Sequence, residues 1–128
     1  MSTMTASAPT RLPDALSIEQ AADILEVPAS RFGASWRQNR ITVPYSGKVS
    51  RQAVTRAFVL LRLQRLLGDS SPLALEVARG LNDPTLDRLL EGAITDIAVR
   101  LPGGVFTVVI PREAIAELRD QLSALAVR

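Results

Sequence analysis

The chain has 128 residues, of which 47% are apolar, 15 are basic and 13 are acidic, and it contains neither Cys nor His. This length and composition suit one small globular domain with a single core and do not suit a disordered chain. Without Cys and His the chain lacks disulfides, thiol nucleophiles, the commonest metal ligands and the usual general base. Its carboxylates, Lys48 and Tyr45 stand in no recognisable catalytic pattern, so we expect neither an enzyme nor a bound cofactor or metal.

Three blocks of different charge lie behind the net charge of +2. The stretch from Arg31 to Arg65 holds eight basic residues and no Asp or Glu. Residues 1–30 hold one Arg against four acids, and residues 66–128 hold six Arg against nine acids. An acid-free basic block suits a polyanionic partner, although a solvated Arg-rich face without a partner would give the same pattern. All but one of the cations are Arg, which suits forked contacts with phosphate or guanine and which a GC-rich genome would also produce.

The first residues carry no sign of a targeting or membrane segment. The stretch MSTMTASAPTRLP lacks the apolar core of a signal peptide, and no apolar run approaches the length of a membrane span. We therefore expect a cytoplasmic protein with no membrane partner. Residues 1–13 are small and polar and contain Pro, which predicts a disordered tail.

The first predicted helix begins at Ser17. Ser17 and Gln20 are three residues apart and match a capping box, in which each side chain bonds the backbone N–H of the other. The helix is expected to end at Val27-Pro28, because the residue before a proline is pushed out of the α region.

A second helix is predicted over residues 28–38. Pro28 suits its first position, where the missing N–H is not needed. Phe32 and Trp36 are four residues apart and share one face, so they should dock on the first helix together with Val27. Asn39 is predicted as the left-handed stop of this helix.

Residues 40–50 have the pattern of a short hairpin. Ile41–Val43 is a β-branched run, Tyr45-Ser46-Gly47-Lys48 is the turn, and Val49 begins the return strand. An ordinary surface hairpin and one that contacts a nucleic acid share this pattern.

The longest predicted helix runs from the Ser50 cap to Gly68. Its apolar face is wide enough to pack on more than one neighbour. That face comprises Ala53, Val54, Ala57, Phe58, Leu61 and Leu66. The more exposed positions of the helix carry Arg51, Arg56, Arg62 and Arg65.

The stretches LSIEQAADILEVPASRFGASWRQNRI and GKVSRQAV, followed by the Leu/Arg-rich helix to Leu67, make a helix-turn-helix pattern with a hairpin behind it. Over about residues 16–80 the chain resembles the winged helix-turn-helix of MerR-type regulators and of small phage excisionases. The resemblance implies that the helix at 28–38 enters the major groove and that the hairpin at 40–50 is a wing beside it. At the turn position where such proteins often carry Gly, this chain has Glu26.

The predicted partner is therefore double-stranded DNA, and the predicted function is that of a sequence-specific, dimeric transcriptional regulator associated with the nucleoid. Base or near-base contacts are assigned to three residues of the second helix: Ser30, Arg31 and Arg37. Phosphate contacts are assigned to basic residues of the hairpin and the following helix: Arg40, Lys48, Arg51 and Arg56. The choice between repressor, activator, excision factor and antitoxin stays open.

Two short helices and a second hairpin follow. Ser71-Pro72 and Asp83-Pro84 are predicted to cap and start the helices LALEVAR and TLDRLLE, which end at Gly80 and Gly92. From Ile94 the period changes, and ITDIAVR and VFTVVI predict a hairpin around a Pro-Gly-Gly loop. The acids of this stretch are interpreted as solvated surface: Glu76, Asp83, Asp87 and Glu91.

Pro111 starts the last predicted helix. Its apolar residues follow spacings of three, four and three, as in a heptad seam: Ile115, Leu118, Leu122 and Leu125. This seam could form a dimer or partner interface, or it could cover the hairpin within one chain. A two-stranded sheet is marginal alone, and strands joined across a two-fold axis would also stabilise it.

The predicted fold class is mainly α with a small β component (α+β). The expected divisions are the tail at 1–13, a DNA-binding unit at 14–68, connecting helices at 69–92 and a dimerisation or partner-binding segment at 93–128. In the alternative interpretation the chain is a protein-interaction adaptor or antitoxin, whose C-terminal hairpin and helix bind a protein partner.

Overall fold

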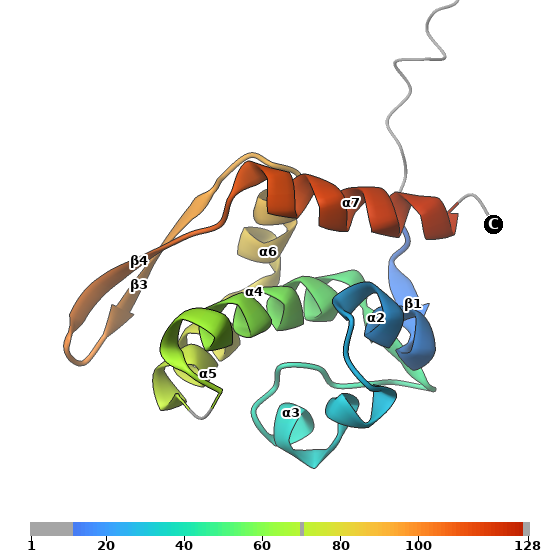
Figure 1. Ribbon diagram of the computed structural model, residues 1–128, viewed down its shortest axis with the longest axis horizontal. Coiled ribbons are helices and arrows are strands. Elements are labelled where there is room, and N and C mark those ends of the chain that lie inside the picture. Colours follow the sequence, from blue (N-terminus) through green and yellow to red (C-terminus); the bar gives the residue numbers. More distant parts are fainter. Residues whose placement is uncertain (1–11, 70, 127–128) are drawn as a thin grey trace, which may run out of the picture.

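The computed structural model describes residues 12–69 and 71–126 (Figure 1). As expected, the chain is mainly α with a small β component, and its β parts are two antiparallel two-stranded sheets. The elements in chain order are β1 (Ala15–Ser17), α2 (Ile18–Leu25), the 3₁₀ helix η1 (Ala29–Phe32), α3 (Ala34–Gln38), β2 (Lys48–Ser50), α4 (Arg51–Leu67), α5 (Pro72–Arg79), α6 (Asp83–Leu90), β3 (Asp96–Leu101), β4 (Gly104–Val109) and α7 (Arg112–Ala126).

Helix α4 is the centre of the fold. In Figure 1, α7 runs above α4 and α2, whereas η1 and α3 lie below α4. The α4 helix begins at the Ser50 cap, whose hydroxyl accepts a hydrogen bond from the Ala53 N–H at 3.0 Å, as predicted. The placement of Leu66 on the apolar face is wrong, since its exposed fraction is 79%. Helix α4 runs past the core before it ends at Gly68, which leaves its last turn in solvent.

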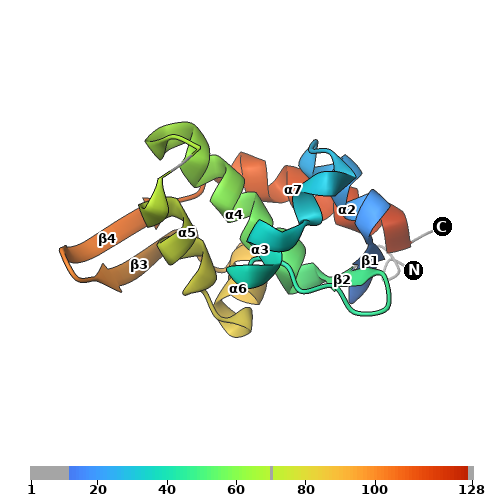
Figure 2. The same ribbon diagram turned by 90° about the horizontal axis from the view of Figure 1, so that it is seen from below.

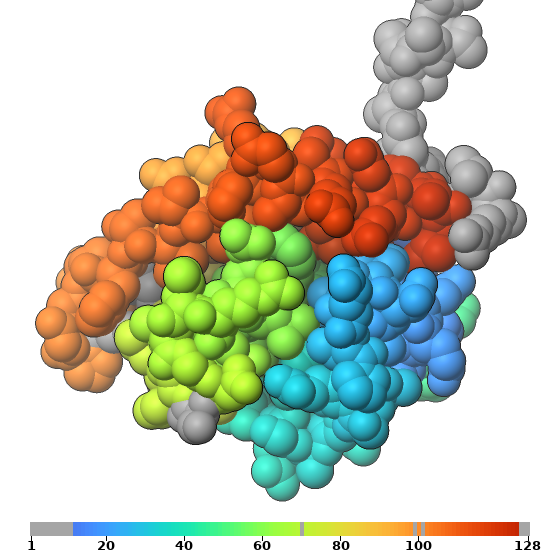
Figure 3. Space-filling model, viewed as in Figure 1, coloured from blue at the N-terminus to red at the C-terminus, as the bar shows by residue number. Residues whose placement is uncertain are grey.

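One hydrophobic cluster extends through the whole described chain. It joins Leu16 of β1, Leu60 of α4, Leu86 of α6, Ile97 of β3 and Leu122 of α7. The core therefore crosses the predicted boundaries at residues 68 and 92. In the space-filling view, α7 lies directly against the segments of α2 and α4 (Figure 3).

Strand β1 was not predicted, and it changes the expected hairpin at 40–50. Residues Lys48–Ser50 pair antiparallel with β1, which brings Leu16 opposite Val49 in the core. The prediction of a strand at Ile41–Val43 is wrong, although Ile41 is fully buried. The turn itself is confirmed, because Tyr45 and Lys48 exchange backbone hydrogen bonds of 2.8 and 3.0 Å.

The predicted second helix over 28–38 is interrupted. The chain forms η1, passes through an extended Gly33 with φ −94° and ψ −157°, and then forms the five-residue helix α3. A Cβ at Gly33 would lie 3.1 Å from the Ser30 carbonyl oxygen, so glycine suits this close approach. The shared aromatic face is confirmed: the rings of Phe32 and Trp36 are buried edge to face with centroids 5.1 Å apart.

Left-handed residues close both helices that flank the turn. Glu26 follows α2 with φ 58°, and the Val27 N–H bonds the Ala22 carbonyl. The prediction of Asn39 as a left-handed stop is wrong by one residue, since Arg40 has φ 58° and Asn39 has φ −89°. In both places an apolar residue follows and bonds back across the last turn, which is the arrangement of a Schellman motif.

The capping box at the start of α2 is confirmed. The Ser17 hydroxyl accepts from the Gln20 N–H at 3.1 Å, and the Gln20 side chain accepts from the Ser17 N–H at 3.0 Å. At α6 the cap is Asn82 rather than Asp83, because the Asn82 side chain accepts from the Thr85 N–H at 2.9 Å.

The second hairpin is confirmed, with β3 and β4 in register from Asp96–Val109 to Leu101–Gly104. Helix α7 packs on α6 and α2 and covers the core. Ile115, Leu118 and Leu122 are buried within the single chain, and Leu125 packs on the same core. The structure therefore has the alternative in which the seam packs within one chain, although it packs against α6 and α2 and not over the hairpin, and its buried residues are not free to form a dimer or partner interface.

Candidate nucleic-acid interface

Four basic side chains of the acid-free block are exposed along one short segment. Arg31 lies in η1, Arg37 in the last turn of α3, Arg40 in the left-handed position after it, and Lys48 at the start of β2. None of the four forms an ion pair within residues 12–69 and 71–126. We call this stretch, residues 29–48, the basic segment.

The basic segment is anchored from inside by apolar side chains. Phe32, Trp36 and Ile41 are buried, and the Ile41 N–H bonds the Trp36 carbonyl at 2.8 Å. Its outward positions carry small or polar residues beside the cations: Ala29, Ser30, Ala34, Ser35 and Gln38. Small side chains let another molecule approach the backbone closely. Figure 2 shows α3 and the loop that leads to β2 lying in front of α4 when the molecule is seen from below.

A shallow hollow borders the basic segment on the side of α5. Ser30, Arg31 and Ser35 line it from one side, and Gln64, Asp69 and Leu75 line it from the other. Asp69 is the one acidic residue among the described residues that line the hollow. Ser30 and Arg31, two of the predicted base-contacting residues, therefore lie at the edge of a concave surface and not on a flat one.

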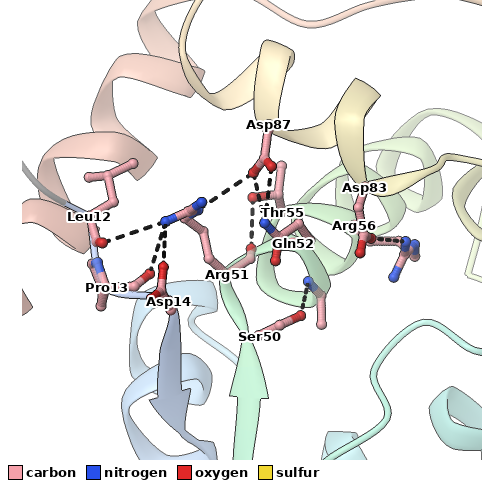
Figure 4. Close-up of polar contacts among 11 residues, drawn as sticks. Leu12, Pro13, Asp14, Ser50, Arg51, Gln52, Thr55, Arg56, Asp83 and Asp87 are labelled. Carbon is pink, nitrogen blue, oxygen red and sulfur yellow. Dashed lines mark hydrogen bonds and ion pairs between the residues drawn. The ribbon is translucent and has the colours of Figure 1, made fainter.

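Arg51 has a different environment, shown in Figure 4. Its Nη1 lies 3.3 Å from Oδ1 of Asp14 and 3.5 Å from the carbonyl oxygens of Leu12 and Pro13, and its Nε lies 3.5 Å from Oδ1 of Asp87. The Arg51 side chain is 22% exposed, and its guanidinium joins the start of the described chain to α6. Arg51 is therefore committed to contacts within the chain.

Arg56 is held in the same way one turn later in α4. Its Nη2 donates to the Leu81 carbonyl oxygen at 3.0 Å and to Oδ1 of Asp83 at 3.2 Å, and its side chain is 15% exposed. The phosphate contacts predicted for Arg51 and Arg56 are for this reason not carried into the proposal below.

Sequence reasoning missed the acids that bind these arginines. Asp83 and Asp87 are four residues apart and lie on one face of α6, at the spacing that matches Arg56 and Arg51 across the helix pair. Gln52 adds hydrogen bonds of 2.9 and 3.1 Å to the Asp87 carboxylate. The interpretation as solvated surface is wrong for Asp87, whose side chain is 33% exposed, whereas the Asp83 side chain is 66% exposed even though it pairs with Arg56. The four-residue spacing of Asp83 and Asp87, which puts both carboxylates on one face of a helix, was the feature of the sequence that could have indicated these ion pairs.

Other kinds of site find little support among the described residues. Within residues 12–69 and 71–126 there is no group of three Asp or Glu side chains that could hold a metal ion. None of the helices in the described part of the chain is long and apolar enough to cross a bilayer. The chain matched no protein-family model, no curated protein and no solved structure.

Proposed function

We propose that this chain binds double-stranded DNA through the basic segment, as expected for a sequence-specific transcriptional regulator. The observation that carries the proposal is that the fold separates six of the eight basic residues of the Arg31–Arg65 block into two groups. Arg51 and Arg56 are bound to the chain's own acids, whereas Arg31, Arg37, Arg40 and Lys48 are exposed without an ion pair in the described chain. Exposed cations held on a rigid support can neutralise phosphates and release counterions.

The geometry limits how the segment can contact DNA. Helix α3 has five residues and is only about 7.5 Å long, so it offers few side chains to base edges. Ser30, Arg31 and Arg37 take that role in the proposal, with the small residues around them allowing close approach. Arg40 and Lys48, which flank the loop between α3 and β2, take the phosphate contacts. Most of the binding free energy then comes from the backbone of the DNA, and the specificity from two or three side chains.

Two left-handed residues, Glu26 just before the basic segment and Arg40 within it, support the same proposal. Non-glycine residues at positive φ cost about 1 kcal/mol each and tend to occur where function requires the conformation. Glu26 fixes the direction in which the chain leaves α2. Arg40 occupies such a position directly after α3 and is itself an exposed cation.

The test is selection from a pool of random duplex DNA at about 150 mM salt, a concentration at which non-specific binding is weak. The wild type is expected to enrich a short motif. The double variant Arg31→Ala/Arg37→Ala is expected to enrich none, while Arg112→Ala, which removes an exposed cation at the start of α7, should enrich the wild-type motif. Failure of the wild type to bind any duplex would overturn the proposal.

The adaptor or antitoxin interpretation keeps one observation in its favour. The buried seam of α7 is not available to a partner, but the β3–β4 hairpin exposes three large apolar side chains: Val105, Phe106 and Val109. An adaptor would not need the basic segment, so it would wash from a DNA column at low salt. Retention that falls steeply with salt supports DNA binding instead.

A further inference from the structure

The β3–β4 hairpin carries an exposed apolar edge that the proposed DNA contact does not use. The hairpin projects beyond the helices in both ribbon views (Figures 1 and 2). Val105 and Val109 on β4 are 61% and 64% exposed, although both are large apolar residues. Isolated exposed apolar residues are common, but here they lie on one strand with a free side.

The register shows which backbone groups of β4 face outward. Leu101 pairs with Gly104 across the two-residue turn, and beyond the other end the Ile110 N–H donates to the Thr95 carbonyl at 2.8 Å. Hydrogen-bonded and non-hydrogen-bonded pairs alternate along an antiparallel ladder. The even-numbered residues of β4 therefore bond to β3. The N–H and C=O groups of Val105, Thr107 and Val109 point away from β3 toward the free edge.

The two edges of the hairpin differ in how they are protected. Strand β3 carries Asp96 and Arg100, and it forms one wall of a groove whose other wall is α5 and α6. Strand β4 has the sequence GVFTVV, with no charged residue and no Pro. Natural edge strands usually carry charges, Pro or a bulge that prevents pairing with another chain. Strand β4 has none of these features, as expected of a strand that pairs in the assembled protein.

We propose that β4 pairs antiparallel with β4 of a second copy of this chain, with the two-fold axis at Thr107, to give a four-stranded sheet. This register brings Thr107 opposite the partner's Thr107, Val105 opposite the partner's Val109, and Phe106 opposite the partner's Val108. The outward N–H and C=O groups of Val105, Thr107 and Val109 then meet their counterparts as hydrogen-bonded pairs.

A second copy fits this edge better than an unrelated strand because the sequence VFTVV is nearly symmetric about Thr107. When two antiparallel copies pair with Thr107 opposite Thr107, every residue of the stretch therefore meets a suitable partner. The pairs that result are aromatic with β-branched, Thr with Thr and Val with Val, and cross-strand pairs of these kinds stabilise sheets. A two-stranded sheet is marginal on its own, whereas four strands with an apolar face are sufficient. The inference concerns the hairpin only and does not depend on the proposed DNA binding.

Single cysteines test both the dimer and its register, since the native chain has no Cys to interfere. In the proposed register the two Cα atoms of residue 107 lie about 5.5 Å apart, within disulfide range. The two copies of residue 105, or of residue 109, are offset by four residues and lie about 13 Å apart. The Thr107→Cys protein is therefore expected to form a disulfide-linked dimer at least about tenfold faster than Val105→Cys, Val109→Cys or the β3 control Ala98→Cys.

Sedimentation of the full chain without DNA provides the second measurement. The wild type should show a concentration-dependent dimer, and Thr107→Lys, which places like charges opposite each other, should raise the dissociation constant by about tenfold or more. Circular dichroism checks that the exposed substitution leaves the helices intact. A wild type that stays monomeric up to about 100 µM, or faster cross-linking at residue 105 than at 107, would overturn the inference. Capture of a different protein by this edge in a monomeric chain would do the same.

Discussion

Arg51 and Arg31 have the same side chain and lie in the same acid-free block, yet the fold treats them in opposite ways. Arg51 is surrounded by Asp14, Asp87 and two backbone carbonyls, whereas Arg31 is exposed on η1 without an ion pair in the described chain. The acids that separate them come from distant parts of the sequence. A local charge count therefore overestimates the cations that are free for a partner, and only the tertiary contacts show which ones remain.

The largest effect is expected from Arg51→Ala. Removing the guanidinium breaks contacts to two carboxylates and two carbonyls, and it leaves the partly buried Asp87 with only Gln52 as a partner. Bonds of this kind contribute about 1.5–3 kcal/mol, and the fully exposed Asp14 adds little, so we expect a loss of about 2 kcal/mol in the free energy of unfolding. Urea denaturation measures it. Arg37→Ala is the matched control and should change stability by less than about 0.5 kcal/mol. Equal losses of stability in Arg51→Ala and Arg37→Ala would contradict the view that Arg51 is bound within the chain and Arg37 is not.

Next in size is the effect of Arg31→Ala on DNA affinity. If Arg31 contacts a base edge, its removal should weaken binding to the selected motif by about 1–3 kcal/mol, which is about tenfold or more. Binding to random DNA should weaken less, because only a phosphate-independent contact is lost. Fluorescence anisotropy on both duplexes at one salt concentration gives the ratio. A similar loss on both would assign Arg31 to the phosphates.

A smaller effect is expected from Arg40→Gly, which should raise the stability of the fold and lower its affinity for DNA. Glycine adopts the left-handed conformation without the clash of a Cβ, at the cost of more freedom in the unfolded chain. The net result should be about 0.5 kcal/mol of added stability together with weaker DNA binding. Glu26→Gly is the control at a left-handed position outside the basic segment and should stabilise the fold without changing affinity. A drop in stability for both variants would show that positive φ carries no strain here.

The smallest effect is expected from Lys48→Ala. Loss of one phosphate contact should reduce the log–log slope of affinity against salt by about 0.9, with only a modest change in affinity at low salt. Titrations at several salt concentrations measure the slope. Arg79→Ala, on the exposed side of α5 and paired with Glu76, serves as the control whose slope should match the wild type. An unchanged slope for Lys48→Ala would remove the turn from the contact surface.

Local signals in the sequence predicted the elements whose ends are set by neighbouring residues. The Ser17–Gln20 capping box, the Ser50 cap and the turn at Tyr45–Lys48 need only residues three positions apart, and each was confirmed. The same holds for the β3–β4 hairpin, because Pro102-Gly103 and two apolar runs suffice to predict it. Helix α7 was also predicted, but the heptad spacing of its apolar residues fitted packing within the chain and contact with a second chain equally well.

Features that depend on distant partners could not be predicted in this way. Strand β1 has three residues and gains its identity only from β2, more than thirty positions later. The break at Gly33 depends on the close approach of the Ser30 carbonyl, which no periodicity reveals. The ion pairs of Arg51 and Arg56 require α6 to pack on α4. For the candidate site, the sequence pointed to the basic block from Arg31 to Arg65, but it could not separate the exposed cations from those already paired with acids of the chain.

The contacts of Arg51 also determine how the molecule should open. Its guanidinium holds residues 12–14 and α6 against the first turn of α4, and the core cluster continues from there to α7. Segments joined in this way tend to exchange their amide hydrogens as one cooperative unit, while exposed ends such as the tip of the β3–β4 hairpin open independently. The basic segment is consequently not a portable module. Its orientation depends on α4, which α6 holds in place, so transplanting residues 14–68 alone would leave behind Asp83 and Asp87, the acids of α6 that pair with α4.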